Sequence, residues 1–188
     1  MKKSTLSLAL AGLMTPGILS AQYLDYTWIQ GGVAFYPSFG NGVGGGSQDF
    51  AGVDTAANFA ITEEVFLLGG VSFLTDDIDF TTIHVGGAYR LPLDPRTDLW
   101  GGLSLEYQEF SNDDSVDDIS IAFRGGLRHR LSEEWEVGGQ LRVVTGDFDY
   151  VGVRGTARYF FREGVAVLGE LDILDGNLGV IAGGTITF

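Results

Sequence analysis

Apolar and polar residues alternate along most of this chain. In ten stretches, nearly every second residue is aliphatic, aromatic or glycine, and the residues between them are polar, small or charged. A repeat of two residues is typical of a β-strand with one apolar and one polar face. Turn signals separate the stretches at short intervals, so the sequence predicts an all-β protein. The predicted strands are residues 23–36, 50–61, 65–74, 80–91, 98–108, 119–131, 135–145, 150–161, 165–174 and 177–188.

The last stretch, NLGVIAGGTITF, shows the pattern most simply. One face carries aliphatic residues, alanine and glycine and ends on Phe188, and the other carries small and polar residues with Ile181 as its one apolar member. The same pattern fits an edge strand of a soluble β-sandwich. The other strands must therefore decide between a soluble sheet and a membrane barrel.

Fully charged residues lie in the middle of the polar faces, several to a strand in places. If the apolar faces packed inward, these residues would form an ordinary solvated surface. If the apolar faces point into lipid, arginines and carboxylates line a polar lumen in which they can pair. On the second interpretation the lumen charge network consists of Arg90, Glu106, Arg124, Arg128, Glu136, Arg142, Arg154, Arg158, Glu170 and Asp172.

Aromatic residues on the apolar faces are sorted to the strand ends, which favours the membrane interpretation. A soluble core has no reason to sort them, whereas membrane barrels carry an aromatic girdle at each interface. The turn-side girdle is Phe59, Tyr89, Trp135, Tyr159, Phe161 and Phe188, and the loop-side girdle is Phe35, Phe73 and Tyr107. We therefore expect a closed antiparallel up-and-down transmembrane β-barrel in a bacterial outer membrane. Ten strands fit best, and merging the two shortest hairpins would give eight.

The first residues agree with this location. Two lysines, a short apolar run, Pro16-Gly17 and small residues up to Ala21 have the organisation of a secretory signal peptide. We expect cleavage after Ala21, with residues 22–188 forming a single barrel domain. That domain has no cysteine and no lysine, and its nine arginines against 25 acidic residues give a formal net charge of −16. Such a charge argues against nucleic acid as a partner.

Paired glycines recur inside the predicted strands. Glycine weakens a strand, so its repeated use suggests relief of curvature in a narrow barrel, with compositional bias as the alternative explanation. The pairs are at 31–32, 69–70, 86–87, 101–102, 125–126, 138–139 and 183–184.

Several strand and turn motifs resemble those of small proteobacterial outer-membrane β-barrel proteins described as OmpX-like or porin-like. The matching stretches are GGAYRLPL with RTDL (86–93 and 96–99), GLRH with Leu131 and Trp135-Glu136 (from 126), ARYF (157–160) and the terminal Phe188. The resemblance implies the fold and the outer-membrane location. It also implies that the C-terminal strand engages the barrel assembly machinery, and that lipid and lipopolysaccharide surround the barrel. It carries no catalytic residue.

Candidate chemistry is sparse, and we expect no enzyme and no resident cofactor. His84 is placed in the lumen near Ser104 and Glu106, which could form a Ser–His–Glu set, but a polar lumen network explains it more simply. His129 is placed near the membrane interface. The acidic loops around Asp76 and Asp117 are candidates for a weak divalent-cation role at the lipopolysaccharide surface, although they lack the spacing of a calcium loop.

Three functions remain open from the sequence. The first is a structural or surface-interaction barrel whose lumen is largely occluded by paired arginine and glutamate side chains. The second is a narrow or gated pore for ions or small solutes, and the third is an outer-membrane lipid or peptide hydrolase. The extracellular partner is not identified by any motif.

Overall fold

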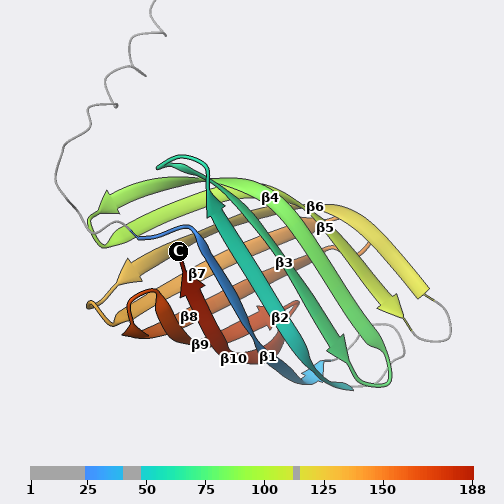
Figure 1. Cartoon of the computed structure of the whole chain (residues 1–188). Coiled ribbons are helices and arrows are strands. Elements are labelled where there is room, and N and C mark those ends of the chain that lie inside the picture. The colour runs from blue at the N-terminus through green and yellow to red at the C-terminus, as the bar shows by residue number, and fades with distance from the viewer. Residues whose placement is uncertain (1–23, 40–47, 112–114) are drawn as a thin grey trace, which may run out of the picture.

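The computed structural model describes residues 24–39, 48–111 and 115–188, and these form a closed barrel (Figure 1). Each strand pairs antiparallel with its neighbours along the chain, and β1 closes against β10. The strands are β1 (Trp28–Phe39), β2 (Gln48–Ala60), β3 (Val65–Thr75), β4 (Asp79–Asp94), β5 (Thr97–Ser111), β6 (Ser115–Arg130), β7 (Trp135–Thr145), β8 (Tyr150–Arg162), β9 (Val165–Leu174) and β10 (Asn177–Thr187).

The ten-stranded up-and-down barrel expected from the sequence is confirmed, and the alternative of eight strands is wrong. The signal peptide and the cleavage site at Ala21 lie outside the described residues. Within those residues, no helix has the length and apolar character needed to cross a membrane.

Side chains alternate between the two faces of the barrel, with apolar ones outside and charged ones inside. Outward residues such as Val33 and Ile119 are 66% and 69% exposed, whereas the inward Glu136 and Asp172 are 0% exposed. Water-soluble monomers rarely expose apolar patches above about 600 Å². Here the apolar surface surrounds the whole barrel, which is the arrangement of a protein whose outer surface contacts lipid.

The two ends of the barrel differ. We call the end with the β2–β3, β4–β5, β6–β7 and β8–β9 connections the turn end, and the opposite end the loop end. The chain enters β1 and finishes at Phe188 at the turn end, where the Phe188 amide donates to the Thr27 carbonyl at 3.0 Å. At the closing seam Trp28 stands opposite Thr187 and Phe35 opposite Val180.

The first strand begins later than the alternating pattern predicts. The pattern indicated a strand from residue 23, but β1 begins at Trp28, which pairs with Asn58 of β2 and Thr187 of β10. Residues 24–26 belong to neither ladder, although β2 continues two residues past Asn58 to Ala60. These residues instead turn into the barrel mouth, where Leu24 and Tyr26 are buried.

Strands β4 and β5 are longer than predicted at both ends, and β6 begins earlier than predicted, at Ser115, but ends at Arg130. The loop predicted at 109–118 is largely strand, with Phe110 opposite Val116. At the turn end β4 passes through Pro92, where a register irregularity follows and β3 no longer pairs with β4. Proline is tolerated there because it lies beyond the last pairing of β4 with β3.

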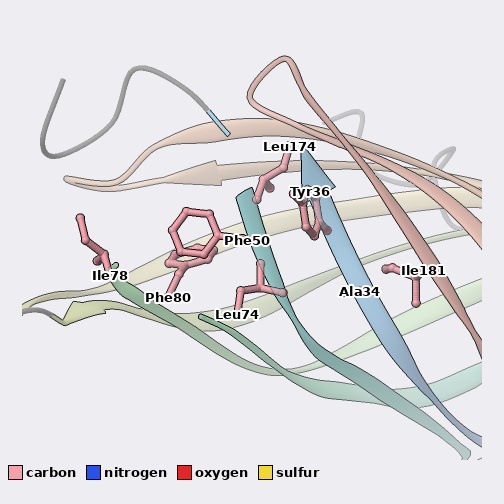
Figure 2. Close-up of a cluster of buried hydrophobic side chains, with 8 residues drawn as sticks. All are labelled: Ala34, Tyr36, Phe50, Leu74, Ile78, Phe80, Leu174 and Ile181. Carbon is pink, nitrogen blue, oxygen red and sulfur yellow. The ribbon is translucent and has the colours of Figure 1, made fainter. Parts of the chain in front are cut away.

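Two apolar layers lie inside the barrel, one at each end. At the loop end the buried cluster consists of Ala34, Tyr36, Phe50, Leu74, Ile78, Phe80, Leu174 and Ile181 (Figure 2). Phe39, Phe110 and Tyr150 pack against it. At the turn end Leu24 and Tyr26 join Phe66, Leu68 and Ala88. The charged side chains occupy the lumen between these two layers.

Inward-facing glycines lie where neighbouring backbones approach closely. A Cβ on Gly102 would lie 2.3 Å from the Gly87 carbonyl oxygen and 2.6 Å from the Ala88 Cα. A Cβ on the outward-facing Gly101 beside it would have its nearest neighbour, the Arg124 carbonyl oxygen, 3.9 Å away. Sharp local curvature therefore explains the inward member of this pair, in agreement with the curvature hypothesis.

We expect Gly102→Ala to destabilise the barrel, because the added methyl group forces apart the backbones of β4 and β5. Overpacking of this kind costs about 1–3 kcal/mol. Urea unfolding in lipid vesicles would measure the loss, with Gly101→Ala as the matched control that leaves the unfolding free energy nearly unchanged. Equal stability of the two variants would contradict the curvature explanation.

Candidate functional site

The candidate site is the charged interior of the barrel. Alternation along the strands directs every second side chain inward, and all ten residues of the sequence-predicted network are buried or half-buried there. The structure adds inward charged residues that the prediction left out, namely Asp54, Asp98 and Arg130. The sequence signal for these three residues was their position on the polar face of strands in which apolar and polar residues alternate. Their partners could not be read from that signal.

Near the turn end, three arginines surround the carboxylate of Glu136 on β7. Arg128 donates from Nε and Nη2 to Oε1 at 3.0 and 2.9 Å, and Arg158 donates from Nη1 to the same oxygen at 2.8 Å. The Arg130 guanidinium lies 3.7 Å from Oε2. Arg158 also donates to Gln30 of β1 at 2.7 Å, so this cluster joins β6, β7, β8 and β1.

In the middle of the lumen, Arg154 of β8 bridges three carboxylates. It donates to Asp54 of β2 at 3.1 Å, to Glu170 at 3.3 Å and to Asp172 at 3.0 Å. Asp54 lies on the far side of the barrel, 100 residues from Arg154 in sequence. This pair therefore braces opposite walls of the lumen.

Toward the loop end, two carboxylates hold tyrosines as well as arginines. Asp172 Oδ2 accepts from Arg142 and from the Tyr36 hydroxyl, each at 2.7 Å. Glu106 accepts from Arg124 and from the Tyr150 hydroxyl. Tyr36 and Tyr150 belong to the loop-end apolar layer, so their hydroxyl groups connect that layer to the charged layer below it.

Every inward arginine of the described residues has a carboxylate within 4 Å. The pairs are Arg90–Asp98, Arg124–Glu106, Arg128–Glu136, Arg130–Glu136, Arg142–Asp172, Arg158–Glu136, and Arg154 with Asp54, Glu170 and Asp172. The seven arginines face six carboxylates, so the lumen is close to neutral although the chain is strongly acidic. Burying a charge without a partner is costly, which accounts for this balance.

A narrow cavity of about 110 Å³ remains beside this network. Its lining runs from Tyr26 and Trp28 at the turn end to Tyr150 and Leu174 at the loop end. Asn58, Ser72, Thr82 and His84 line one wall and the paired arginines line the other. The space suits on the order of ten water molecules or a small solute, since one water needs about 10–15 Å³.

His84 does not assemble with the serine and glutamate that the hydrolase hypothesis requires. It stands opposite Glu106 in the β4–β5 register, and Ser104 is opposite Gly86. However, Ser104 accepts a hydrogen bond from Arg124, and Glu106 is held by Arg124 and Tyr150. Among the described residues, no hydrogen bond joins His84 to either side chain. His129, near the turn end, instead bonds Thr97 at 2.8 Å.

The aromatic residues assigned to the girdles lie on the outer face. The exposed ones are Phe59, Tyr89, Trp135, Tyr159, Phe161 and Phe188 at the turn end and Phe35 and Phe73 at the loop end, and Tyr107 is half-buried. Trp135 and Tyr159 pack against each other on adjacent strands with ring centroids 5.0 Å apart.

The acidic residues at the loop end include one, Asp118, that holds a neighbouring connection. Within the described ranges, no three histidine, aspartate or glutamate side chains are grouped as metal ligands. Asp113 and Asp114 lie outside those ranges. Asp118 accepts from the Ser120 hydroxyl at 2.6 Å and from the Asp147 amide at 3.0 Å, and so ties the β7–β8 connection to β6.

Protonating Asp118 is expected to loosen the β7–β8 connection. The hydrogen bond from Ser120, together with the backbone amides, lowers the pKa of Asp118, which lies beyond the last pairing of β6 with β7. The resulting stabilisation is complete above the unfolded pKa of about 3.9 and is lost as pH falls through the lower folded value. A carboxyl ¹³C titration in micelles would measure the folded-state pKa of Asp118. A midpoint at or above about 3.9 would contradict the lowered pKa.

Comparison with known proteins gives likeness of fold only. No protein-family model matches the chain, and no curated protein matches it. Among solved structures, the chain is similar to the KdgM porin at 9% identity, covering 85% of this chain and 99% of that chain with a TM-score of 0.49. It is also similar to the outer membrane protein OprG from Pseudomonas aeruginosa (14% identity, 89% and 99% covered, TM-score 0.47). A bacterial polysaccharide outer membrane secretin is a third (16% identity, 88% and 67% covered, TM-score 0.48).

Proposed function

We propose that this protein is an integral β-barrel of a bacterial outer membrane with a closed lumen and a structural or surface-interaction role. Membrane insertion is supported by the inside-out distribution of side chains, with an apolar outer face and a charged interior. The signal peptide predicted at residues 1–21 supports export to the envelope. On this proposal the partners of the outer face are outer-membrane lipid and lipopolysaccharide.

The closed lumen rests on one observation, the complete pairing of the inward arginines. Each guanidinium is held by a carboxylate, and pairs such as Arg154–Asp54 cross the barrel. A conducting path needs mobile water along its length and charged groups that interact with the passing ion. Here those groups are occupied by one another, and an apolar layer lies at each end.

Planar-bilayer recording of the refolded protein tests this proposal. We expect no steady single-channel openings, because the paired side chains leave only a narrow cavity. A porin inserted under the same conditions would show that openings are detected, and heat-modifiable gel mobility would show that the protein is folded. Steady open channels from the wild-type protein would overturn the closed barrel.

A gated pore for ions or small solutes is the second candidate. The observation that favours it is the cavity, whose lining extends from one apolar layer to the other. On this second candidate, side chains of the apolar layers at the two ends would have to move to connect this space to solvent. Voltage-dependent openings in the same recordings would support the pore.

Hydrolysis is the least supported of the three functions. The serine and glutamate that the mechanism needs are both engaged by Arg124, and the nucleophile has no hydrogen bond to His84 in the described residues. A nucleophilic serine must be bonded to its general base or come within reach of it. We therefore propose a non-enzymatic role.

A further inference from the structure

The residues that precede β1 fill the turn-end mouth of the barrel. Leu24 is 2% and Tyr26 3% exposed, although neither belongs to a strand. Leu24 packs in the apolar layer with Phe66, Leu68 and Ala88. The Tyr26 ring lies 4.5 Å from the Phe66 ring and forms part of the cavity lining. This short segment therefore separates the cavity from the turn-end solvent.

The mouth recognises this segment in the manner of a peptide-binding site. Two arginines donate to consecutive main-chain carbonyls, Arg90 to Leu24 at 3.1 Å and Arg128 to Asp25 at 2.6 Å. The same two guanidinium groups lie over the Tyr26 ring, at 5.1 and 4.5 Å from its centroid. Main-chain bonds hold an extended chain, and the two side-chain pockets select a leucine and an aromatic ring two residues apart.

Release of the segment leaves no buried charge without a partner. Arg90 keeps its ion pair with Asp98 at 3.0 Å, and Arg128 keeps its paired hydrogen bonds to Glu136. From the segment the two arginines lose neutral partners, namely two main-chain carbonyls and the face of the Tyr26 ring, and water can replace the carbonyls once the mouth is open. If the segment were essential to the charge network, its release would leave an arginine without a carboxylate partner. The contacts are therefore those of a segment that can dissociate from the mouth.

We propose that the turn-end mouth is a binding site for an extended peptide of the pattern Leu-x-aromatic. In this structure the chain's own residues 24–26 fill the site and act as a releasable plug over the cavity. This proposal rests on the proposed closed barrel. It adds that residues 24–26 are the segment that closes the turn end. Tethering gives the plug a high effective concentration, so a competing peptide must be supplied in excess.

Thiol accessibility tests the plug, because the natural chain has no cysteine. Asn58 lines the cavity near the mouth, so Asn58→Cys reports access to that space. With the plug intact we expect a charged methanethiosulfonate reagent to modify this thiol slowly in micelles. Adding Leu24→Ala and Tyr26→Ala should raise the rate at least tenfold. Glu63→Cys, on the exposed β2–β3 turn, is the control whose rate stays constant in both backgrounds.

Two further comparisons separate the plug from a loss of folding. Tyr26→Phe keeps the ring that the two guanidinium groups contact and should keep Asn58→Cys protected. Heat-modifiable mobility shows that each variant is a folded barrel. In the Leu24→Ala, Tyr26→Ala background, millimolar acetyl-Leu-Asp-Tyr-Thr-amide should slow modification, whereas the same peptide with alanine for tyrosine should not.

Three results would overturn the proposal. They are fast modification with the plug intact, an unchanged rate without it, and no effect of the tyrosine peptide. None of them requires steady conductance by the wild-type protein, so failure of the plug is distinguishable from failure of the closed barrel.

Discussion

Replacing Glu136 with alanine is expected to destabilise the barrel strongly. The carboxylate is fully buried and accepts from Arg128 and Arg158, and Arg130 lies 3.7 Å away. Removing it leaves these positive charges facing one another without a counter-charge. Loss of one partner of a buried ion pair costs about 3–5 kcal/mol. Urea unfolding in lipid vesicles, followed by tryptophan fluorescence, would measure the loss of unfolding free energy.

The control for this prediction lies three residues away. Glu133 is on the exposed β6–β7 turn, so Glu133→Ala removes the same chemical group and should change the unfolding free energy by no more than about 0.5 kcal/mol. Glu136→Gln should fall between the two, because the amide oxygen still accepts a hydrogen bond but carries no charge. A stable Glu136→Ala variant would show that water or rearranged side chains compensate the arginines.

Placing an arginine at Leu141 is expected to give the second large effect. Leu141 lies in the middle of β7 on the outer face and is half exposed. In a membrane barrel this position faces the centre of the bilayer, where an arginine on the lipid face costs about 2–4 kcal/mol. The loss would be measured by unfolding in vesicles. In a soluble barrel the same exposed substitution would be nearly neutral.

Depth within the membrane supplies the matched control. Leu131 is also outward-facing and exposed, but it lies at the turn end just after β6. Leu131→Arg should therefore cost only about 0–1 kcal/mol, because arginine reaches the headgroups from there. Equal effects at the two positions would contradict the placement of Leu141 at the centre of the bilayer and of Leu131 near its surface.

On the proposed function, the charged interior fixes the shape of a closed lumen. Buried ion pairs add little net stability compared with well-packed apolar residues, but breaking one is strongly destabilising. Arg154 and Asp54 connect β8 to β2, and Arg158 and Gln30 connect β8 to β1. These contacts oppose widening of the barrel. A lumen held in this way suits a closed barrel better than a pore that must open to conduct.

The sequence by itself determined the local features of this protein. A side-chain period of two is a property of each strand alone, so the ten strands, their apolar and polar faces and the inward direction of Arg124 or Glu170 could be predicted before any pairing was known. The placement of aromatic residues at the strand ends follows from the same pattern, which favoured ten strands but left eight open. These features depend on residues only a few positions apart.

Only the tertiary structure decided which residues meet. Arg154 and Asp54 are 100 residues apart and come together only because the sheet closes, which fixes the register around the barrel. The turn-end plug could not be predicted either, because Leu24 and Tyr26 continue the alternation of a strand. They lie outside the strand ladders that begin at Trp28 and are buried in the barrel mouth, a placement that the two-residue period does not reveal. Strand periodicity is a local property of the chain, whereas contacts across a lumen depend on closure.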